Sequence, residues 1–441
     1  MSEWAKVRLK DIAEIKIGGT PSRTISAYWA SEGQDGHQWC AISDLKGRYI
    51  SETKERITDS GVINSNVKLL NAGSFVMSFK LSIGRGAILK SPMYTNEAIA
   101  GFESKGAINS DFLYYVLPQA ALRSVTDVAV KGATLNKESL GNIVLSIPAS
   151  ESQQGCIANI LQTIDEAIEK TEQLIEKYQQ IKAGLMNDLF TRGIGADGKL
   201  RPPRDQAPEL YWESPIGWIP KDWECIKLED LLDKVPNNLR SGPFGSALLK
   251  AELVEDGIPF LGIDNIYIEK FDDDFRRFVS ERKFNELSKY AVRKGDVIIT
   301  IMGTVGRAAV VPSSVERALS SKHLWTMTFD GNRVIPELIC WQLNFSSWVK
   351  SWFRRETQGG IMDAIQSKTL RALRLPVPCF DEQKRIHERY VYLTSKLRQE
   401  ELLVEKLRKQ KSGLMHDLLT GNVSVSADLP VEPASPEEGA A

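Results

Sequence analysis

Glu172-Gln-Leu-Ile-Glu-Lys-Tyr-Gln-Gln-Ile-Lys-Ala-Gly-Leu-Met-Asn-Asp-Leu-Phe-Thr191 recurs as Glu401-Leu-Leu-Val-Glu-Lys-Leu-Arg-Lys-Gln-Lys-Ser-Gly-Leu-Met-His-Asp-Leu-Leu-Thr420, at a constant shift of 229 residues. Glu-Lys, Gly-Leu-Met, Asp-Leu and Thr recur in step, and the alignment needs no gap. A repeat of this length is a supersecondary unit used twice, and it divides the rest of the chain.

Both copies carry apolar residues at alternating steps of four and three, which predicts one long helix in each. Such a heptad seam needs a partner helix, so we expect an intramolecular coiled coil rather than an ordinary amphipathic hairpin in a larger helical core. The seam residues are Ile157, Leu161, Ile164, Ile168, Ile175, Tyr178, Leu185 and Leu189 in the first copy and Ile386, Tyr390, Leu393, Leu397, Val404, Leu407, Leu414 and Leu418 in the second.

Two seam positions are polar in both copies, and polar seam residues fix the register of a coiled coil. They are Thr171 with Glu400 and Lys182 with Lys411. Ser150 with Gln153 predicts a capping box at the first helix start, and Asp381 an N-cap at the second. Gly193 and Gly421 stand where the helices would stop.

The composition is that of a globular protein of two or three domains, with 441 residues, 42% of them hydrophobic and 26% charged. No apolar run approaches a membrane span, and the N-terminus lacks a signal-peptide core. The five cysteines are scattered, which indicates a reducing, cytoplasmic location. The formal net charge of −1 does not by itself indicate nucleic-acid binding.

The chain reads as two globules alternating with two helices. Two segments of the first globule recur in the second. Trp4-Ala-Lys-Val-Arg-Leu-Lys-Asp-Ile is matched by Trp223-Glu-Cys-Ile-Lys-Leu-Glu-Asp-Leu, and Gly73–Ser78 is matched by Gly295–Thr300. The sequences between these matching segments diverge. Strands mixed with helices predict α/β or α+β globules. The predicted divisions are a first globule (1–150), a first helix (151–192), a linker (193–218), a second globule (219–379), a second helix (380–421) and a disordered acidic tail without Lys or Arg (422–441).

With these motifs, the chain resembles the specificity subunit of type I restriction-modification enzymes. The resemblance covers residues 1 to about 421 and is carried by the combination of four motifs. They are the opening Trp-x-x-Val/Ile-x-Leu-x-Asp at Trp4 and Trp223, Gly295-Asp-Val-Ile-Ile-Thr-Ile-Met-Gly-Thr-Val-Gly-Arg307, Pro376-Val-Pro-Cys-Phe-Asp-Glu-Gln383 and Lys411-Ser-Gly-Leu-Met-His-Asp-Leu-Leu-Thr-Gly421. The first helix start departs from the pattern, with Ser152-Gln-Gln-Gly-Cys-Ile157 where the second has Glu382-Gln-Lys-Arg-Ile386.

The resemblance implies that each globule is a target-recognition domain reading one half of a split, asymmetric double-stranded DNA sequence. It implies that the helices form an antiparallel coiled coil, set the spacing between the halves and dock two modification subunits that carry S-adenosylmethionine. Restriction subunits, which translocate DNA with ATP and Mg²⁺, would also join. This chain would be non-catalytic and hold no cofactor.

The physics of split-site reading supports the same interpretation. Recognition units that read two sites along one duplex must be held about 34–36 Å apart, one helical turn. A stiff coiled coil can hold that distance, whereas a flexible linker would blur it. Divergent globules on a shared frame are expected if the half-sites differ.

The candidate DNA-binding residues are donors in loops beside accessible glycines. Arg and Lys contact guanine, Gln and Asn contact adenine, and Ser and Thr mostly hold phosphates. Arg85 and Arg307 recur in the shared frame, so phosphate positioning or structure suits them better than base reading. The candidates are Thr20, Ser22, Arg23, Lys80, Ser82, Arg85, Lys131 and Thr134 in the first globule and Arg240, Ser241, Ser246, Thr304, Arg307, Lys322, His323 and Gln358 in the second.

Catalytic signatures are missing from the sequence. It has no phosphate-binding Gly-x-x-x-x-Gly-Lys-Ser/Thr loop, no Asn/Asp-Pro-Pro-Tyr/Phe and no metal-ligand spacing among its four histidines. Arg276-Arg277-Phe278 mixes aromatic and basic residues, which is compatible with binding to the DNA backbone. The alternatives are a coiled-coil adaptor whose globules bind proteins instead of DNA, and an enzyme with an unrecognised site.

Overall fold

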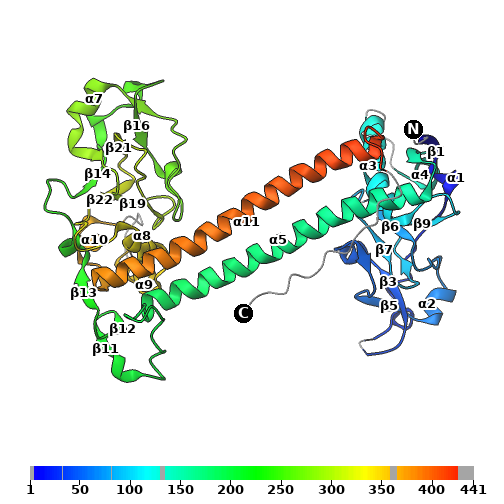
Figure 1. Ribbon diagram of the computed structural model, residues 1–441, viewed down its shortest axis with the longest axis horizontal. Coiled ribbons are helices and arrows are strands. Elements are labelled where there is room, and N and C mark those ends of the chain that lie inside the picture. Colours follow the sequence, from blue (N-terminus) through cyan, green and yellow to red (C-terminus); the bar gives the residue numbers. More distant parts are fainter. Residues whose placement is uncertain (1–3, 32, 81, 130–134, 358–364, 426–441) are drawn as a thin grey trace. The chain divides into compact units, whose positions relative to one another are not determined.

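The computed structural model describes residues 4–31, 33–80, 82–129, 135–357 and 365–425, which fall into two compact units (Figure 1). The first unit comprises residues up to Gln173 and from Glu401 onward, and the second comprises Leu174–Glu400. Three of the predicted DNA-binding residues, Lys131, Thr134 and Gln358, lie outside the described residues, as does the predicted tail from residue 426.

The first globule contains a five-stranded sheet in the order β2-β9-β6-β7-β4, a three-stranded sheet β5-β3-β8 and the pair β1-β10. Phe75, Met77 and Phe102 are fully buried on the larger sheet, under α3. The elements are β1 (Trp4–Arg8), α1 (Leu9–Ile12), β2 (Ala13–Ile17), β3 (His37–Cys40), β4 (Tyr49–Ile50), β5 (Glu55–Ile57), α2 (Asp59–Ile63), β6 (Phe75–Ser78), β7 (Gly86–Leu89), β8 (Tyr94–Thr95), β9 (Ile99–Ser104), α3 (Ser110–Ala129), α4 (Lys137–Gly141) and β10 (Val144–Pro148).

The second unit has sheets β14-β22-β19-β20 and β15-β17-β16-β21-β18 and the pairs β13-β23 and β11-β12. Its elements are β11 (Tyr211–Ser214), β12 (Gly217–Pro220), β13 (Glu224–Lys227), α6 (Leu228–Leu231), β14 (Leu239–Ser241), β15 (Leu253–Val254), β16 (Ile258–Leu261), β17 (Phe278–Val279), α7 (Glu281–Glu286), β18 (Ala291–Val292), β19 (Val297–Thr300), β20 (Ala308–Val310), β21 (Ala318–Ser320), β22 (Leu324–Met327), α8 (Pro336–Phe345), α9 (Ser347–Thr357), α10 (Ser367–Ala372) and β23 (Arg374–Val377).

The two globules share one strand plan. β6 lies antiparallel between β7 and β9, and β19 lies antiparallel between β20 and β22. Each globule also has a short parallel pair at the equivalent place, β3 with β8 and β16 with β21, and the first globule has a second parallel pair, β4 with β7. The predicted mixed helix-and-strand class is confirmed, and so is the repetition of the frame.

Two helices of 41 residues carry the predicted seams, α5 (Glu151–Thr191) and α11 (Phe380–Thr420). All sixteen seam residues are buried or half-buried. Both helices end at a glycine with positive φ, Gly193 at 65° and Gly421 at 76°, as the sequence predicted.

The helices pair antiparallel, as the resemblance implied. In the first unit, the beginning of α5 lies against the end of α11, where Asp165 pairs with Lys411 and Glu172 with Arg408, both at 2.6 Å. In the second unit, the end of α5 shares a hydrophobic cluster with the beginning of α11, to which Leu189 and Ile386 contribute.

The two helix starts differ in their caps but share one glutamine contact. Ser150 caps α5 by accepting from the backbone N–H of Gln153, which is one half of the predicted capping box, while the side chain of Gln153 donates to Val425 O at 3.4 Å. The N-cap prediction for Asp381 is wrong, because α11 already begins at Phe380. At the equivalent positions, fully buried Gln154 and Gln383 each donate at 3.0 Å to the carbonyl of the proline that precedes the helix.

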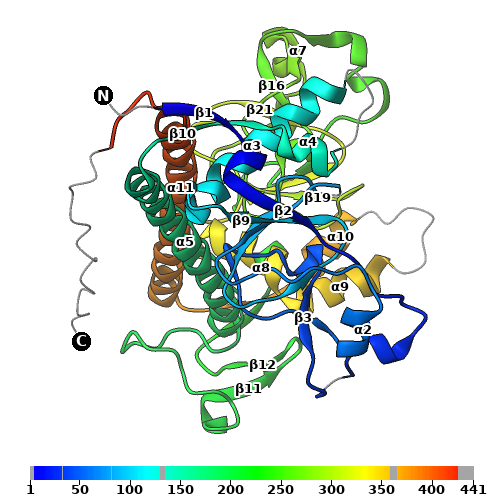
Figure 2. The ribbon, with the colours of Figure 1, turned by 90° about the vertical axis from the view of Figure 1, so that its right-hand side faces the viewer.

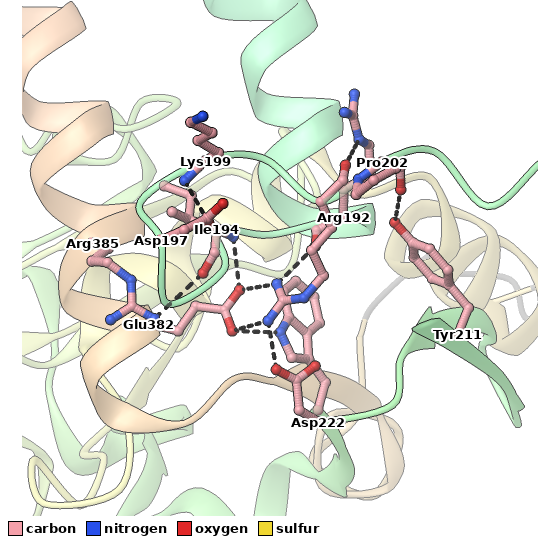
Figure 3. Close-up of polar contacts among 11 residues, drawn as sticks. Arg192, Ile194, Asp197, Lys199, Pro202, Tyr211, Asp222, Glu382 and Arg385 are labelled. Atoms are coloured by element: carbon pink, nitrogen blue, oxygen red, sulfur yellow. Dashed lines mark hydrogen bonds and ion pairs between the residues drawn. The ribbon is translucent and has the colours of Figure 1, made fainter. Parts of the chain in front are cut away.

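The predicted linker is folded onto the second unit. Glu382, in the first turn of α11, accepts hydrogen bonds from Ile194 N at 2.8 Å, Trp223 Nε1 at 3.1 Å and both Nη atoms of Arg201 (Figure 3). Arg201 also pairs with Asp222. We call these five residues the Glu382 cluster. It ties the segment that follows α5 and the residues just before β13 to the beginning of α11.

Candidate nucleic-acid interface

Four loops converge on one face of the first globule. The segment after β8 is bonded to the other three: Gly19 N donates to Thr95 O at 2.8 Å, Asn96 N to Cys40 O at 3.0 Å and Phe79 N to Ala98 O at 3.0 Å. We call this set, residues 18–24, 41–45, 79–80, 82–85 and 95–98, the first loop face.

The second globule builds the same face from equivalent loops. Gly242 N donates to Ser321 O at 3.2 Å, Ser321 N to Leu261 O at 2.9 Å and Ile301 N to His323 O at 3.0 Å. The second loop face comprises residues 242–248, 262–265, 301–307 and 320–323, together with Arg277, which binds Asp264. The two faces therefore share their backbone connections, although their side chains differ.

A glycine opens each loop face because no side chain fits there. A Cβ on Gly18 would collide with the backbone of Thr95 and Asn96, and one on Gly242 would collide with the backbone of Ser320 and Ser321. This close approach explains the glycines that the sequence places after β2 and β14.

The first loop face brings four of the predicted residues together. Thr20 donates to Glu97, while Lys80 and Arg23 carry the charges near that carboxylate. The hydrogen bond from Thr20, helped by these two charges, lowers the pKa of Glu97. Ser22 is exposed and hydrogen-bonds Thr24 at 2.8 Å.

Arg23 is exposed but firmly held. Its two Nη nitrogens bind the two carboxylate oxygens of Glu55 on β5, and its guanidinium lies 3.7 Å from the ring centre of Trp29. The indole N–H groups of Trp29 and Trp39 donate to Ser22 O and Gly19 O, which fixes the loop that carries Arg23.

The second loop face differs from the first in containing a hollow of about 490 Å³. Arg277, Lys322 and His323 line it together with apolar side chains such as Leu248 and Phe260, and no Asp or Glu is found among its described lining residues. Arg277 pairs with Asp264 and fits flat against Gly262, where a Cβ would displace it. Burial, with the charges of Lys322 and Arg277, lowers the pKa of His323.

Two predicted DNA-binding residues of the second globule are corrected by the structure. Arg240 is buried and donates to Asp296, Ala291 O and Asn237 O. Ser241 is buried and donates to Lys322 O at 3.3 Å. Neither side chain reaches the surface, because β14 is buried on both of its faces, so these two residues hold the frame instead of presenting donors to DNA.

The remaining predicted residues lie at the edges of the two faces. Ser82 is exposed with φ 52°, and Arg85 is exposed. Ser246 is exposed in the turn beside Phe244, which is 61% exposed. Thr304 is half-buried, and Arg307 lies over Tyr267 at 5.8 Å.

Carboxylates attach each globule to the helices. In the first unit, Asp165 on α5 accepts from Tyr115 on α3 at 2.8 Å and pairs with Lys411 on α11. In the second, Glu269 pairs with Lys182 on α5 and accepts from Tyr390 on α11. The polar seam lysines thus meet a carboxylate in both copies, but the carboxylate comes from a different element each time.

Within the described ranges, no group of His, Cys, Asp and Glu is arranged to hold a metal ion. No helix of the described part of the chain is long and apolar enough to cross a membrane.

Two similar globules with matching loop faces, alternating with two paired helices, define a duplicated recognition protein. The family model described as "Type I restriction modification DNA specificity domain" matches residues 1–180 and 220–405, and the chain belongs to this family. The matched segments correspond to the two copies of the repeat.

Individual relatives agree with this assignment. The chain is 25% identical over 439 residues to the type I restriction enzyme MjaVIII specificity subunit of Methanocaldococcus jannaschii, covering 96% of this chain and 93% of that protein. It is 21% identical over 314 residues to the type I restriction enzyme EcoBI specificity subunit of Escherichia coli, covering 69% of this chain and 64% of that protein. The crystal structure of a type I S subunit from M. genitalium shares the fold, with a TM-score of 0.53, 16% identity and 95% and 96% coverage.

Proposed function

We propose that this chain is the DNA-specificity subunit of a type I restriction-modification complex, in which each globule reads one half of a split target. The observation that carries this proposal is the pair of loop faces. They have the same backbone connections but different side chains, Arg23 with Glu55 in one and Arg277 with Asp264 in the other. A shared frame with different surface chemistry suits two unlike half-sites.

The helices supply the second part of the proposal. α5 and α11 would set the distance between the half-sites and dock two modification subunits carrying S-adenosylmethionine. Restriction subunits using ATP and Mg²⁺ would join the same complex. The chain itself would contribute recognition and assembly without catalysis or a cofactor, a role supported by its membership of a DNA-specificity family.

Exchange of one globule tests the proposal directly. Residues 1–150 are replaced by the corresponding globule of a related subunit, and the complex with modification subunits is read by methylation sequencing of host DNA. We expect one half of the methylated motif to change while the other half and the spacer stay the same. A motif changed in both halves, or no split motif for the unmodified chain, would overturn the proposal.

A further inference from the structure

The geometry points to Arg23 as the residue that reads a guanine in the half-site of the first globule. This inference rests on the proposed function and adds to it a base and the side chain that recognises it. The observations behind it are the fixed position of Arg23, its exposure, its remaining donors and the charges around it.

Arg23 is held in place before any ligand arrives. Glu55 binds both of its Nη nitrogens, with Nη2 to Oε2 at 3.0 Å, and its guanidinium carbon lies 3.7 Å from the ring centre of Trp29. Even so, 52% of the Arg23 side chain is exposed. A free arginine loses rotamer entropy on binding, so an exposed arginine already fixed by its neighbours is suited to precise recognition.

The contacts of Arg23 leave a pair of donors for recognition. A guanidinium has about five N–H donors in one plane. Glu55 takes one from each Nη, and the guanidinium carbon lies 3.7 Å from the ring centre of Trp29 and 5.1 Å from that of Trp39. Among the described residues, the Nε–H and the adjacent outer Nη–H have no hydrogen-bond partner. Such a pair matches the O6 and N7 acceptors of guanine in the major groove.

The charges around Arg23 favour a base over a phosphate. Besides Glu55, the carboxylate of Glu97 acts on Arg23, and Lys80 is the further cation close to Glu97. Two acidic groups thus offset two basic groups at this point of the first loop face. A phosphate would be repelled by the carboxylates, whereas a base edge carries no net charge and requires directed donors.

The test uses the complex of this chain with its modification subunits and the variant Arg23→Lys, which keeps the charge and removes the fork. In the unmodified complex we expect a guanine in the first half-site that is preferred over other bases by about 10-fold or more. For the variant, the methylation of sequences with guanine at that position and of sequences with adenine should differ by no more than about threefold. The bases read in the second half-site should be unchanged.

Two further variants separate recognition from structure. Glu55→Gln weakens the ion pair that holds Arg23, so it should partly reduce the preference for guanine at the same position. Arg204→Lys is the matched control, because Arg204 also lies over a tryptophan, Trp218, at 4.8 Å, but is not part of either loop face. The complex that contains Arg204→Lys should methylate the same motif as the unmodified complex. Retained second-half specificity shows that each variant is folded and assembled.

Two results of the methylation assay would overturn the inference: a motif unaltered by Arg23→Lys, or a first half-site without guanine. A third would be an Arg23→Ala variant whose DNA affinity falls equally for all sequences. Its slope of log affinity against log salt concentration would then fall by about one, as loss of a phosphate contact predicts. These results differ from failure of the proposed function, in which the unmodified complex shows no split motif.

Discussion

At the scale of single residues, Glu382 is a buried charge whose loss should be costly. Its side chain is 1% exposed and that of its partner Arg201 is 11% exposed. Glu382→Ala would leave the guanidinium of Arg201 without its main partner, so we expect a loss of about 3–5 kcal/mol in the free energy of unfolding, measured in urea. Glu382→Gln should lose less, because it keeps an acceptor for Ile194 N.

Asp222 provides the matched control for Glu382. It binds the same guanidinium, but its side chain is 61% exposed. Asp222→Asn should therefore cost less than about 1 kcal/mol. Equal losses for the Asp222 and Glu382 variants would contradict the role given to burial.

The hollow of the second loop face predicts a pH dependence through His323. The pKa of this histidine is lowered by burial and by the charges of Lys322 and Arg277. Below about pH 6.5 the unfolded chain takes up a proton that the folded histidine resists, so stability falls as the pH drops. Arg277→Ala should raise the pKa of His323 in an NMR titration, and Arg276→Ala, at an exposed neighbour, should not. A His323 pKa unmoved by Arg277→Ala would contradict the arrangement of the hollow.

At the scale of elements, replacing glycine by alanine should have opposite effects inside the long helices and just beyond the end of α5. Gly184 and Gly413 occupy the same repeat position inside α5 and α11 and have open space around them. Alanine there should stabilise the chain by about 1 kcal/mol each, since glycine is a poor helix residue. At Gly193, with φ 65° and with Trp223 and Glu382 in the way, alanine should destabilise. Thermal unfolding measures all three, and a stabilised Gly193→Ala would contradict the helix end described here.

The elements also show which parts of the fold were predictable from sequence. The seam was, because heptad spacing depends only on local order, and every seam residue proved buried or half-buried. The loop faces were predictable only in part. Arg240 was misassigned because its partner Asp296 follows 56 residues later and no local pattern marks the pair. Arg277 was recognised only as part of a basic and aromatic segment compatible with binding to the DNA backbone. The hollow that it lines could not be predicted, because loops distant in sequence form it.

At the scale of the whole molecule, the duplication explains how one frame can carry two specificities. The frame is set by glycines that approach backbone, such as Gly18 and Gly242, and by the buried glutamines at the helix starts. The residues that differ, such as Arg23 and Arg277, take no part in the contacts of Gly18, Gly242 or these glutamines. Recognition can therefore change in one globule without disturbing the helix pair.

The claim that the helix pair sets the half-site spacing is tested most directly by lengthening both helices. One heptad is inserted after Gln173 in α5 and another after Glu400 in α11, so that the antiparallel seam stays in register. Because a heptad adds about 10 Å of helix, the methylated motif of the assembled complex should keep both half-sites and gain about one to three base pairs of spacer. A heptad in one helix alone should break the pairing and abolish methylation. A spacer of unchanged length in the double insertion would contradict the claim.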